Sequence, residues 1–264
     1  MSELLVAQDV SRNFGGVQAL ANVSFAIGRG EIYGLIGPNG AGKTTLFNVL
    51  TGMMPANSGR FRFDGGSLEG LKAHQIAARG IARTFQNIRL FANLSALENV
   101  MIGRHARTRS GVVGAVLRDR ATREEEADTE RRAFELLRFT GIAARANDAA
   151  GTLAYGDQRR LEIARALATE PKLLALDEPA AGMNAPETVA LSRLLHAIRD
   201  KGITLLLIEH DMRLVMSVCD RVLVLDYGER IAEGRPVEIQ HDPRVIEAYL
   251  GAPAAAVPGA ASSA

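Results

Sequence analysis

The chain has 264 residues, of which 47% are hydrophobic and 23% charged, so it can bury a sizeable core in one large domain or two small ones. Its formal net charge of +1 lacks the basic excess that usually marks a nucleic-acid-binding protein. Cys219 is the only cysteine, which excludes an internal disulfide and fits a reducing cytosol.

The first third of the chain predicts short strands around a glycine-rich loop. One apolar strand leads into this loop, and a helix leaves it. Asp64-Gly65-Gly66 is a turn signal that closes the last of these strands. The expected strands are 4–10, 20–27, 31–36 and 60–63, and the expected helix is 42–50. We expect them to include a small antiparallel sheet beside the loop.

The middle of the chain, roughly 87–165, predicts helices. Residues 124–137 are rich in Glu, Ala, Arg and Leu, which are good helix formers. Residues 158–169 give a second strong helical pattern. Its candidate buried positions are Leu161, Ile163, Ala164 and Ala168. This region is therefore expected to form a helical subdomain inserted into an α/β core.

The last third alternates strands and helices. Residues 204–208 form a continuous apolar run, typical of a strand buried on both faces of a parallel sheet. Asp242 is expected to cap a final helix that has Pro243 at its first position and ends at Gly251. The other expected elements are a strand over 172–176, a helix over 187–201 and a hairpin of 222–225 with 230–232. The patternless residues 252–264 predict a disordered tail after a folded domain of residues 1–251.

Residues 37–45 contain the complete phosphate-binding motif G-x-x-x-x-G-K-[ST], placed between a predicted strand and a predicted helix. Glycines let backbone N–H groups converge on phosphates, and the helix N-terminus favours negative charge. Lys43 is expected to reach the β- and γ-phosphates, and the Thr44 hydroxyl to bind Mg²⁺. The alternative is a glycine-rich turn without a ligand. The predicted ATP-binding residues here are Gly37, Pro38, Asn39, Gly40, Ala41, Gly42, Lys43, Thr44 and Thr45.

Two adjacent carboxylates, Asp177 and Glu178, follow the apolar run 173–176. Asp177 is expected to hold Mg²⁺ through water, and Glu178 to act as the general base on the attacking water. The alternative is an acidic pair that faces solvent at a strand end. Because hydrolysis at a phosphate-binding loop needs both roles, the pair predicts an ATPase rather than a kinase or a passive nucleotide binder.

With these motifs, the chain resembles the ATP-binding-cassette (ABC) ATPases over nearly its whole length, the tail excepted. Other segments that agree in order and spacing are Thr84-Phe85-Gln86, the signature segment Leu153-Ala154-Tyr155-Gly156-Asp157, Ala181-Gly182-Met183-Asn184 and Glu209-His210-Asp211. The resemblance implies an α/β fold: a RecA-like P-loop NTPase core with a small antiparallel β subdomain and an inserted helical subdomain. It also implies ATP and Mg²⁺ as cofactors.

The resemblance assigns roles to three further residues. Gln86 would be a Mg²⁺ ligand and a link to a transmembrane partner. His210 would contact the γ-phosphate, the alternative being a satisfied core histidine. Phe14 would stack on adenine, the alternative being an ordinary packed aromatic. The expected metal ligands are thus Thr44, Gln86 and Asp177, and the expected catalytic residues are Glu178 and His210.

The signature segment departs from the family pattern Leu-Ser-Gly-Gly-Gln. Ala154 replaces a serine whose hydroxyl would meet the γ-phosphate, Tyr155 replaces a glycine, and Asp157 stands where Gln is expected. In this family the signature of one subunit closes over the phosphate loop of another, so two ATPs lie between two subunits. The departures predict unequal sites if the partner carries a complete signature.

Several stretches look like the G-type ATPase subunit of branched-chain amino acid uptake, where Ala154 and Tyr155 are at home. They are residues 83–91, 155–165, 177–184, 209–212 and 245–251. The implied function is an ATP-hydrolysing subunit that energises an importer. Urea or short-amide import and lipopolysaccharide export are the related alternatives. The implied partners are permease subunits, a second ABC ATPase subunit and, indirectly, a periplasmic binding protein.

The membrane is expected to be reached through those partners. No apolar run approaches the ~20 residues of a membrane helix, and we identify no secretory signal. We therefore expect a peripheral protein at the cytoplasmic face of the plasma membrane. A soluble ABC ATPase acting on ribosomes or DNA is the competing hypothesis, although nucleic acid is not expected as a partner. The six arginines of 104–123 predict a solvated, salt-bridged helical surface or, alternatively, a contact with a membrane partner or acidic lipids.

Overall fold

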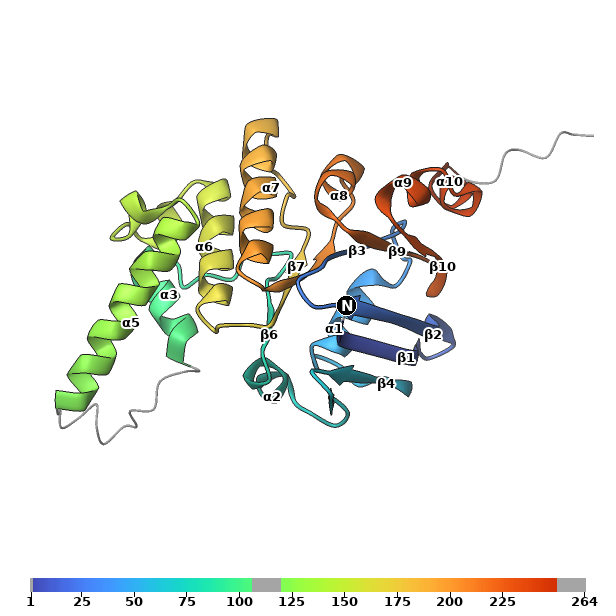
Figure 1. The fold of residues 1–264 in the computed structure, drawn as a ribbon, viewed down its shortest axis with the longest axis horizontal. Coiled ribbons are helices and arrows are strands. Elements are labelled where there is room, and N and C mark those ends of the chain that lie inside the picture. Colours follow the sequence, from blue (N-terminus) through green and yellow to red (C-terminus); the bar gives the residue numbers. More distant parts are fainter. Residues whose placement is uncertain (1, 106–119, 251–264) are drawn as a thin grey trace, which may run out of the picture.

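The centre of the protein is a six-stranded sheet with the order β10-β9-β3-β8-β7-β6 (Figure 1). The computed structural model describes residues 2–105 and 120–250. The strands are β3 (Ile32–Ile36), β6 (Ile81–Arg83), β7 (Leu173–Asp177), β8 (Thr204–Ile208), β9 (Arg221–Asp226) and β10 (Glu229–Gly234). All neighbours are parallel except β9 and β10, which form the predicted hairpin. Every residue of β3, β7 and β8 is buried, as their continuous apolar sequences predict.

A second sheet is fully antiparallel and has the order β2-β1-β4-β5. Its strands are β1 (Glu3–Phe14), β2 (Val17–Gly28), β4 (Ser58–Phe63) and β5 (Gly66–Ser67). The predicted small antiparallel sheet is therefore confirmed. The first two strands are longer than predicted, because pairing continues through polar residues to Phe14 and Val17 at the hairpin turn.

Helices cover both faces of the central sheet, and a further group of helices lies beyond its β6 edge (Figure 1). They are α1 (Lys43–Leu50), α2 (Ala73–Ala78), α3 (Ala96–Arg104), α5 (Arg120–Phe139), α6 (Tyr155–Leu167), α7 (Ala185–Asp200), α8 (Met212–Val218), α9 (Pro236–Gln240) and α10 (Pro243–Leu250). The sequence patterns did not predict α2, β6, α8 and α9, which are short, and they placed α3 only within the helical region 87–165. Helix α6 begins three residues before the predicted start, so it includes part of the signature segment.

The two faces of the central sheet pack into two separate hydrophobic cores. Tyr33 and Leu35 pack into the core shared with α1 and the antiparallel sheet, whereas Ile32 and Ile36 face the core shared with α7 and α8. A third core joins α3, α5 and α6. The predicted buried positions of α6 are all in these cores: Leu161, Ile163, Ala164 and Ala168 are each at most 1% exposed.

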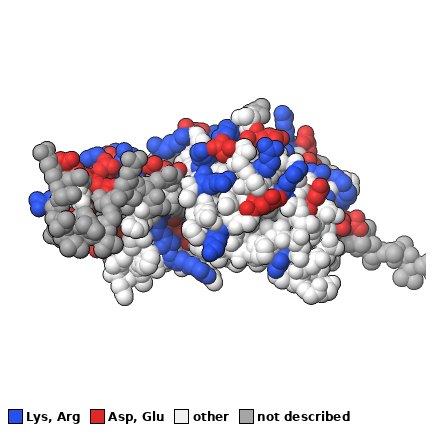
Figure 2. Space-filling view, turned by 90° about the horizontal axis from the view of Figure 1, so that it is seen from below, with Lys and Arg blue, Asp and Glu red and all other residues white. Residues whose placement is uncertain are grey.

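The structure describes part of the arginine-rich segment 104–123, for which the sequence predicts a solvated, salt-bridged surface. Arg104 forms ion pairs with Glu170 at 3.0 Å and Asp128 at 4.0 Å, as a salt-bridged surface predicts, but it is only 9% exposed and so is not solvated. That part of the prediction is wrong: α3 packs against α5 and carries Arg104 into their interface. Most of the arginine segment, and the predicted tail 252–264, lie outside the described residues. On the face drawn in Figure 2, basic and acidic residues are interspersed.

Candidate functional site: an ATPase centre

The phosphate loop lies where the sequence predicts it, between the carboxyl end of β3 and the first turn of α1. Gly42, the residue before α1, has φ of 99°, and a Cβ there would lie 2.5 Å from the carbonyl oxygen of Ala19. A Cβ on Gly37 would lie 2.1 Å from the carbonyl oxygen of Leu225. Both positions therefore need glycine. The loop presents the free N–H groups of α1's N-terminus, a ready site for phosphate.

Lys43 is fixed directly over this loop. Its Nζ donates hydrogen bonds to the carbonyl oxygens of Gly37, at 2.7 Å, and Pro38, at 2.8 Å. Burial lowers the pKa of Lys43, while the nearby carboxylates of Glu178 and Asp177 oppose that shift. Next to it, Thr44 is exposed, so its hydroxyl is accessible to a ligand.

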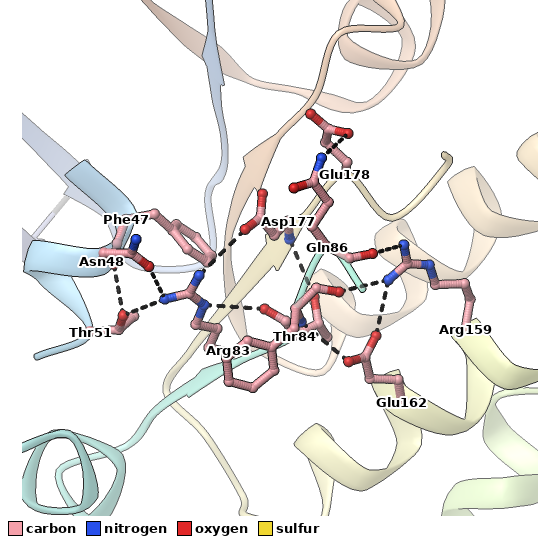
Figure 3. A network of polar contacts seen from close by, with 11 residues as sticks. Phe47, Asn48, Thr51, Arg83, Thr84, Gln86, Arg159, Glu162, Asp177 and Glu178 are labelled. Carbon is pink, nitrogen blue, oxygen red and sulfur yellow. Dashed lines mark hydrogen bonds and ion pairs between the residues drawn. The ribbon is translucent and has the colours of Figure 1, made fainter. Parts of the chain in front are cut away.

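Asp177 is the last residue of β7 and is 3% exposed. An Nη atom of Arg83 lies 3.4 Å from its carboxylate, and the backbone N–H of Asp177 donates to the Thr84 hydroxyl at 3.3 Å (Figure 3). Burial raises the pKa of Asp177, and Arg83 opposes that shift. Asp177 is thus a buried carboxylate with a cation beside it, not an acid facing solvent.

Glu178 lies just beyond the strand, in a strained conformation with φ of 46°. Gln86 Nε2 donates to its carboxylate at 3.1 Å, and His210 Nδ1 lies 3.7 Å from the same oxygen. Left-handed backbone at a residue other than glycine is costly and concentrates at functional sites. The structure therefore brings Glu178, Gln86 and His210 together from three segments that are far apart in the sequence.

His210 and Phe14, for which a residue packed in the core was the alternative, are both exposed. The side chain of His210 is 63% exposed, which is inconsistent with a satisfied core histidine. Phe14 ends β1 and is 45% exposed, with the Arg12 guanidinium 4.9 Å from its ring centroid. Phe14 is thus available for stacking and is not packed into the core.

The signature segment forms the start of α6. Ala154 is the N-cap and makes no side-chain capping bond, whereas Leu153 is buried. Asp157 forms an ion pair with Arg160 at 3.6 Å, which offsets the charge that could repel a phosphate. A Cβ on Gly156 would lie 2.8 Å from Glu187 in α7, so the segment packs against α7. Among the described residues, no hydrogen bond joins it to the phosphate loop of the same chain.

Sequence reasoning missed Arg83. Its guanidinium lies 4.5 Å from the ring centroid of Phe47 and 5.0 Å from that of Phe85, and it also donates to Asn48 and Thr51, at 2.7 and 2.9 Å (Figure 3). An arginine at the end of a short strand carries no motif of its own. The role of Arg83 becomes apparent only in the fold, where residues of α1 and β7 lie next to the end of β6.

Two models of known protein families match this chain. The family model "ABC transporter" matches residues 20–181, and the model "Branched-chain amino acid ATP-binding cassette transporter" matches residues 229–255. A phosphate loop beside a strand-end carboxylate pair, on an α/β core with an antiparallel sheet, defines a nucleotide hydrolase of the ABC class. The chain belongs to the family of ABC transporter ATP-binding proteins.

Within that family, the chain resembles the ATPases of branched-chain amino acid uptake. It is 43% identical to the high-affinity branched-chain amino acid transport ATP-binding protein BraF of Pseudomonas aeruginosa, over 94% of this chain and 98% of that protein. It is 44% identical to the corresponding protein LivG of Escherichia coli, with the same coverage. Identity to the lipopolysaccharide export system ATP-binding protein LptB of E. coli is lower, 36% over 94% of this chain and 97% of that protein.

Solved structures agree with the fold. A nucleotide-free ATP-binding cassette from an ABC transporter has a TM-score of 0.83 and 33% identity, covering 95% of this chain and all of that one. A dimeric post-hydrolysis state of an ATP-binding cassette, bound to ADP and phosphate, has a TM-score of 0.75 and 25% identity, covering 88% of this chain and 99% of that one. Over residues 2–105 and 120–250, no helix is long and apolar enough to cross a membrane.

Proposed function

We propose that the chain is the ATP-hydrolysing subunit of an ABC importer for branched-chain amino acids. The observation that carries the proposal is the geometry around Glu178, whose carboxylate lies 3.1 Å from Gln86 Nε2 and 3.7 Å from His210 Nδ1, next to the phosphate loop. A carboxylate that is held by an amide and a histidine beside a phosphate site is suited to orient and deprotonate an attacking water.

Each residue has a specific task in this proposal. The N–H groups of the loop and Lys43 bind the phosphates, Phe14 stacks on the adenine, and His210 contacts the γ-phosphate. Thr44, Gln86 and Asp177 offer hydroxyl, amide and carboxylate oxygens, the hard ligands that Mg²⁺ prefers, so the residues present fit that ion. Bound there, Mg²⁺ would neutralise charge on the phosphates. Glu178 accepts the proton of the attacking water.

The signature segment supports a site shared between two subunits. It contacts α7 of its own chain rather than its own phosphate loop, so a second ATPase subunit is needed to place a signature opposite the phosphates. The dimeric ATP-binding cassette among the similar structures is consistent with this arrangement. With Ala154 in place of the expected serine, the two sites differ if the partner subunit carries a complete signature. Closure around two ATPs then completes each site, and hydrolysis reopens it.

The cargo and the location follow from similarity alone. The proteins that are 43–45% identical serve branched-chain amino acid transport, whereas the lipopolysaccharide export protein is more distant, at 36%. We therefore favour branched-chain amino acids over the alternatives of urea or amide import and lipopolysaccharide export. The subunit would bind permease subunits at the cytoplasmic face of the plasma membrane, and a periplasmic binding protein would deliver the cargo.

The test is to compare wild type with Lys43→Ala, using Lys72→Ala as an exposed-lysine control. Wild type and the control should hydrolyse ATP, and Lys43→Ala should lose ATP binding and turnover. Normal steady-state hydrolysis by Lys43→Ala would refute the assignment. For the cargo, the subunit should co-purify with integral membrane subunits, and the reassembled transporter should take up leucine in an ATP-dependent way. Uptake of urea instead of leucine would refute the cargo.

A further inference from the structure

A buried ion pair lies inside the signature helix. Arg159 and Glu162 are each 2% exposed, and Arg159 Nη1 lies 3.2 Å from the Glu162 carboxylate. Arg159 belongs to the first turns of α6, which start with the signature residues. The pair faces the segment that follows β6 and carries Gln86 (Figure 3).

The pair forms hydrogen bonds with both the carbonyl and the N–H groups of that segment's backbone. Arg159 donates to the carbonyl oxygen of Phe85 at 2.8 Å and also to that of Gln86. Glu162 in turn accepts a hydrogen bond from the backbone N–H of Phe85 at 3.2 Å. Because hydrogen bonds to charged groups are the strong ones, three of them on two successive residues fix the path of the chain there. The Gln86 side chain then reaches Glu178.

Tyr155 joins the same network from the signature segment. Its hydroxyl accepts a hydrogen bond from Arg159 Nη2 at 3.0 Å, and its ring centroid lies 5.4 Å from the Arg159 guanidinium. A Cβ on Gly182 would lie 3.2 Å from Cε1 of Tyr155, so the ring also packs on the loop after Glu178. One tyrosine thus contacts Arg159, which holds the Gln86 segment, and the loop that follows Glu178.

This network is a poor device for stability alone. Burial raises the pKa of Glu162, with Arg159 and the Phe85 N–H opposing that shift. Arg159 Nε, also buried, has no hydrogen-bond partner within the described structure. Buried ion pairs are weak stabilisers, since desolvation offsets their attraction, and similar apolar residues are often as stable. Such a pair does, however, fix the relative position of the groups that it contacts.

We propose that Tyr155, Arg159 and Glu162 are positioning residues that hold Gln86 against Glu178, so that the placement of the general base depends on the signature segment of the same chain. The proposal rests on the proposed ATPase function. Among the described residues, no hydrogen bond joins any of the three directly to Glu178, which Gln86 contacts. A displacement at the start of α6 moves the carbonyl oxygens of Phe85 and Gln86, and with them the amide group that contacts Glu178.

The first test does not need activity. Amide hydrogen exchange over residues 84–88 is measured in the nucleotide-free full chain for wild type, Tyr155→Phe and Arg159→Met. We expect exchange to rise by roughly tenfold or more in Arg159→Met, and by a smaller factor in Tyr155→Phe, because charged hydrogen bonds are lost. Tyr33→Phe is the matched control, since its hydroxyl donates to Glu233 at 2.8 Å and makes no contact with this segment. Exchange within about twofold of wild type in both variants would overturn the proposal.

The second test separates positioning from a structural role. In Tyr155→Phe we expect kcat for ATP hydrolysis to fall by roughly tenfold, with the Tm and the Kd of the isolated chain for ATP unchanged, because small misplacements at a reacting centre are costly. In a Gln86→Ala background the same substitution should have little further effect, since both act through one group. An unchanged kcat in Tyr155→Phe, or fully additive losses with Gln86→Ala, would overturn the proposal. Absence of hydrolysis by wild type would instead refute the proposed function and leave the exchange result to decide the inference.

Discussion

Arg83 provides a test of how the Asp177 site is built. The variant Arg83→Met removes the cation but keeps a long apolar side chain between the rings of Phe47 and Phe85, where sulfur packs well. Asp177 is 3% exposed, and the substitution leaves its carboxylate without the guanidinium that lies 3.4 Å away. We therefore expect a loss of stability that originates at Asp177.

The size of the loss can be bounded. Removing one partner of a buried ion pair typically costs ~3–5 kcal/mol. Asp177 can also become neutral by taking up a proton. From its ordinary pKa of 3.8 this costs at most ~4.4 kcal/mol near pH 7, at 1.36 kcal/mol for each pH unit above the pKa. Burial already raises that pKa, and 3.4 Å is a long contact, so we expect ~2–4 kcal/mol. This corresponds to a decrease in Tm of roughly 4–16 °C.

The assay is urea denaturation without nucleotide or Mg²⁺. Arg89→Met is the control, because Arg89 lies 4.5 Å from the Phe85 ring centroid and forms no ion pair with Asp177 in the described part of the chain, so its loss should cost ~1 kcal/mol or less. The double variant Arg83→Met/Asp177→Asn should recover most of the stability. The deficit of the single variant should also shrink as the pH falls, because a carboxyl with a raised pKa gains its neutral form first. A deficit below ~1 kcal/mol, or no recovery with Asp177→Asn, would refute the reasoning.

Three further predictions concern the rest of the chain. Glu178→Gln should keep ATP affinity while hydrolysis falls by ~10²–10⁴-fold, and undiminished turnover would contradict the general-base role. Phe14→Ala should raise the Kd for ATP by roughly 5- to 150-fold, from a stacking energy of ~1–3 kcal/mol, and an unchanged Kd would dismiss the stacking. Hydrogen bonds from Lys172 and Arg29 lower the pKa of Asp64 to about 2. Its stabilising effect is therefore present above the ordinary value of 3.8 and lost as the pH falls through about 2. Asp64→Asn should lower the Tm near neutral pH. The difference in Tm between wild type and this variant should narrow as the pH falls from 3.8 to about 2, and a difference that does not change with pH would contradict the stabilising role of Asp64.

Local sequence was enough wherever one segment carries its own signal. The phosphate loop is a contiguous motif that its own nine residues identify, although the contacts that require Gly37 and Gly42 come from Leu225 and Ala19. The strands β3, β7 and β8 were predicted because burial on both faces requires continuous apolar residues. Short elements such as α2 and β6 were missed, since few residues give no readable period and tertiary packing decides them.

The sequence by itself determined the class of protein, the phosphate loop and the strand-end pair Asp177 and Glu178. It left open whether His210 was a core residue and gave Arg83 no role. Only the tertiary structure placed His210 and Gln86 beside Glu178, Arg83 beside Asp177, and Arg159 on the backbone of the Gln86 segment. The physical reason is that these contacts join segments separated by 32 to 94 positions along the chain, so their geometry depends on sheet order and helix packing rather than on local pattern.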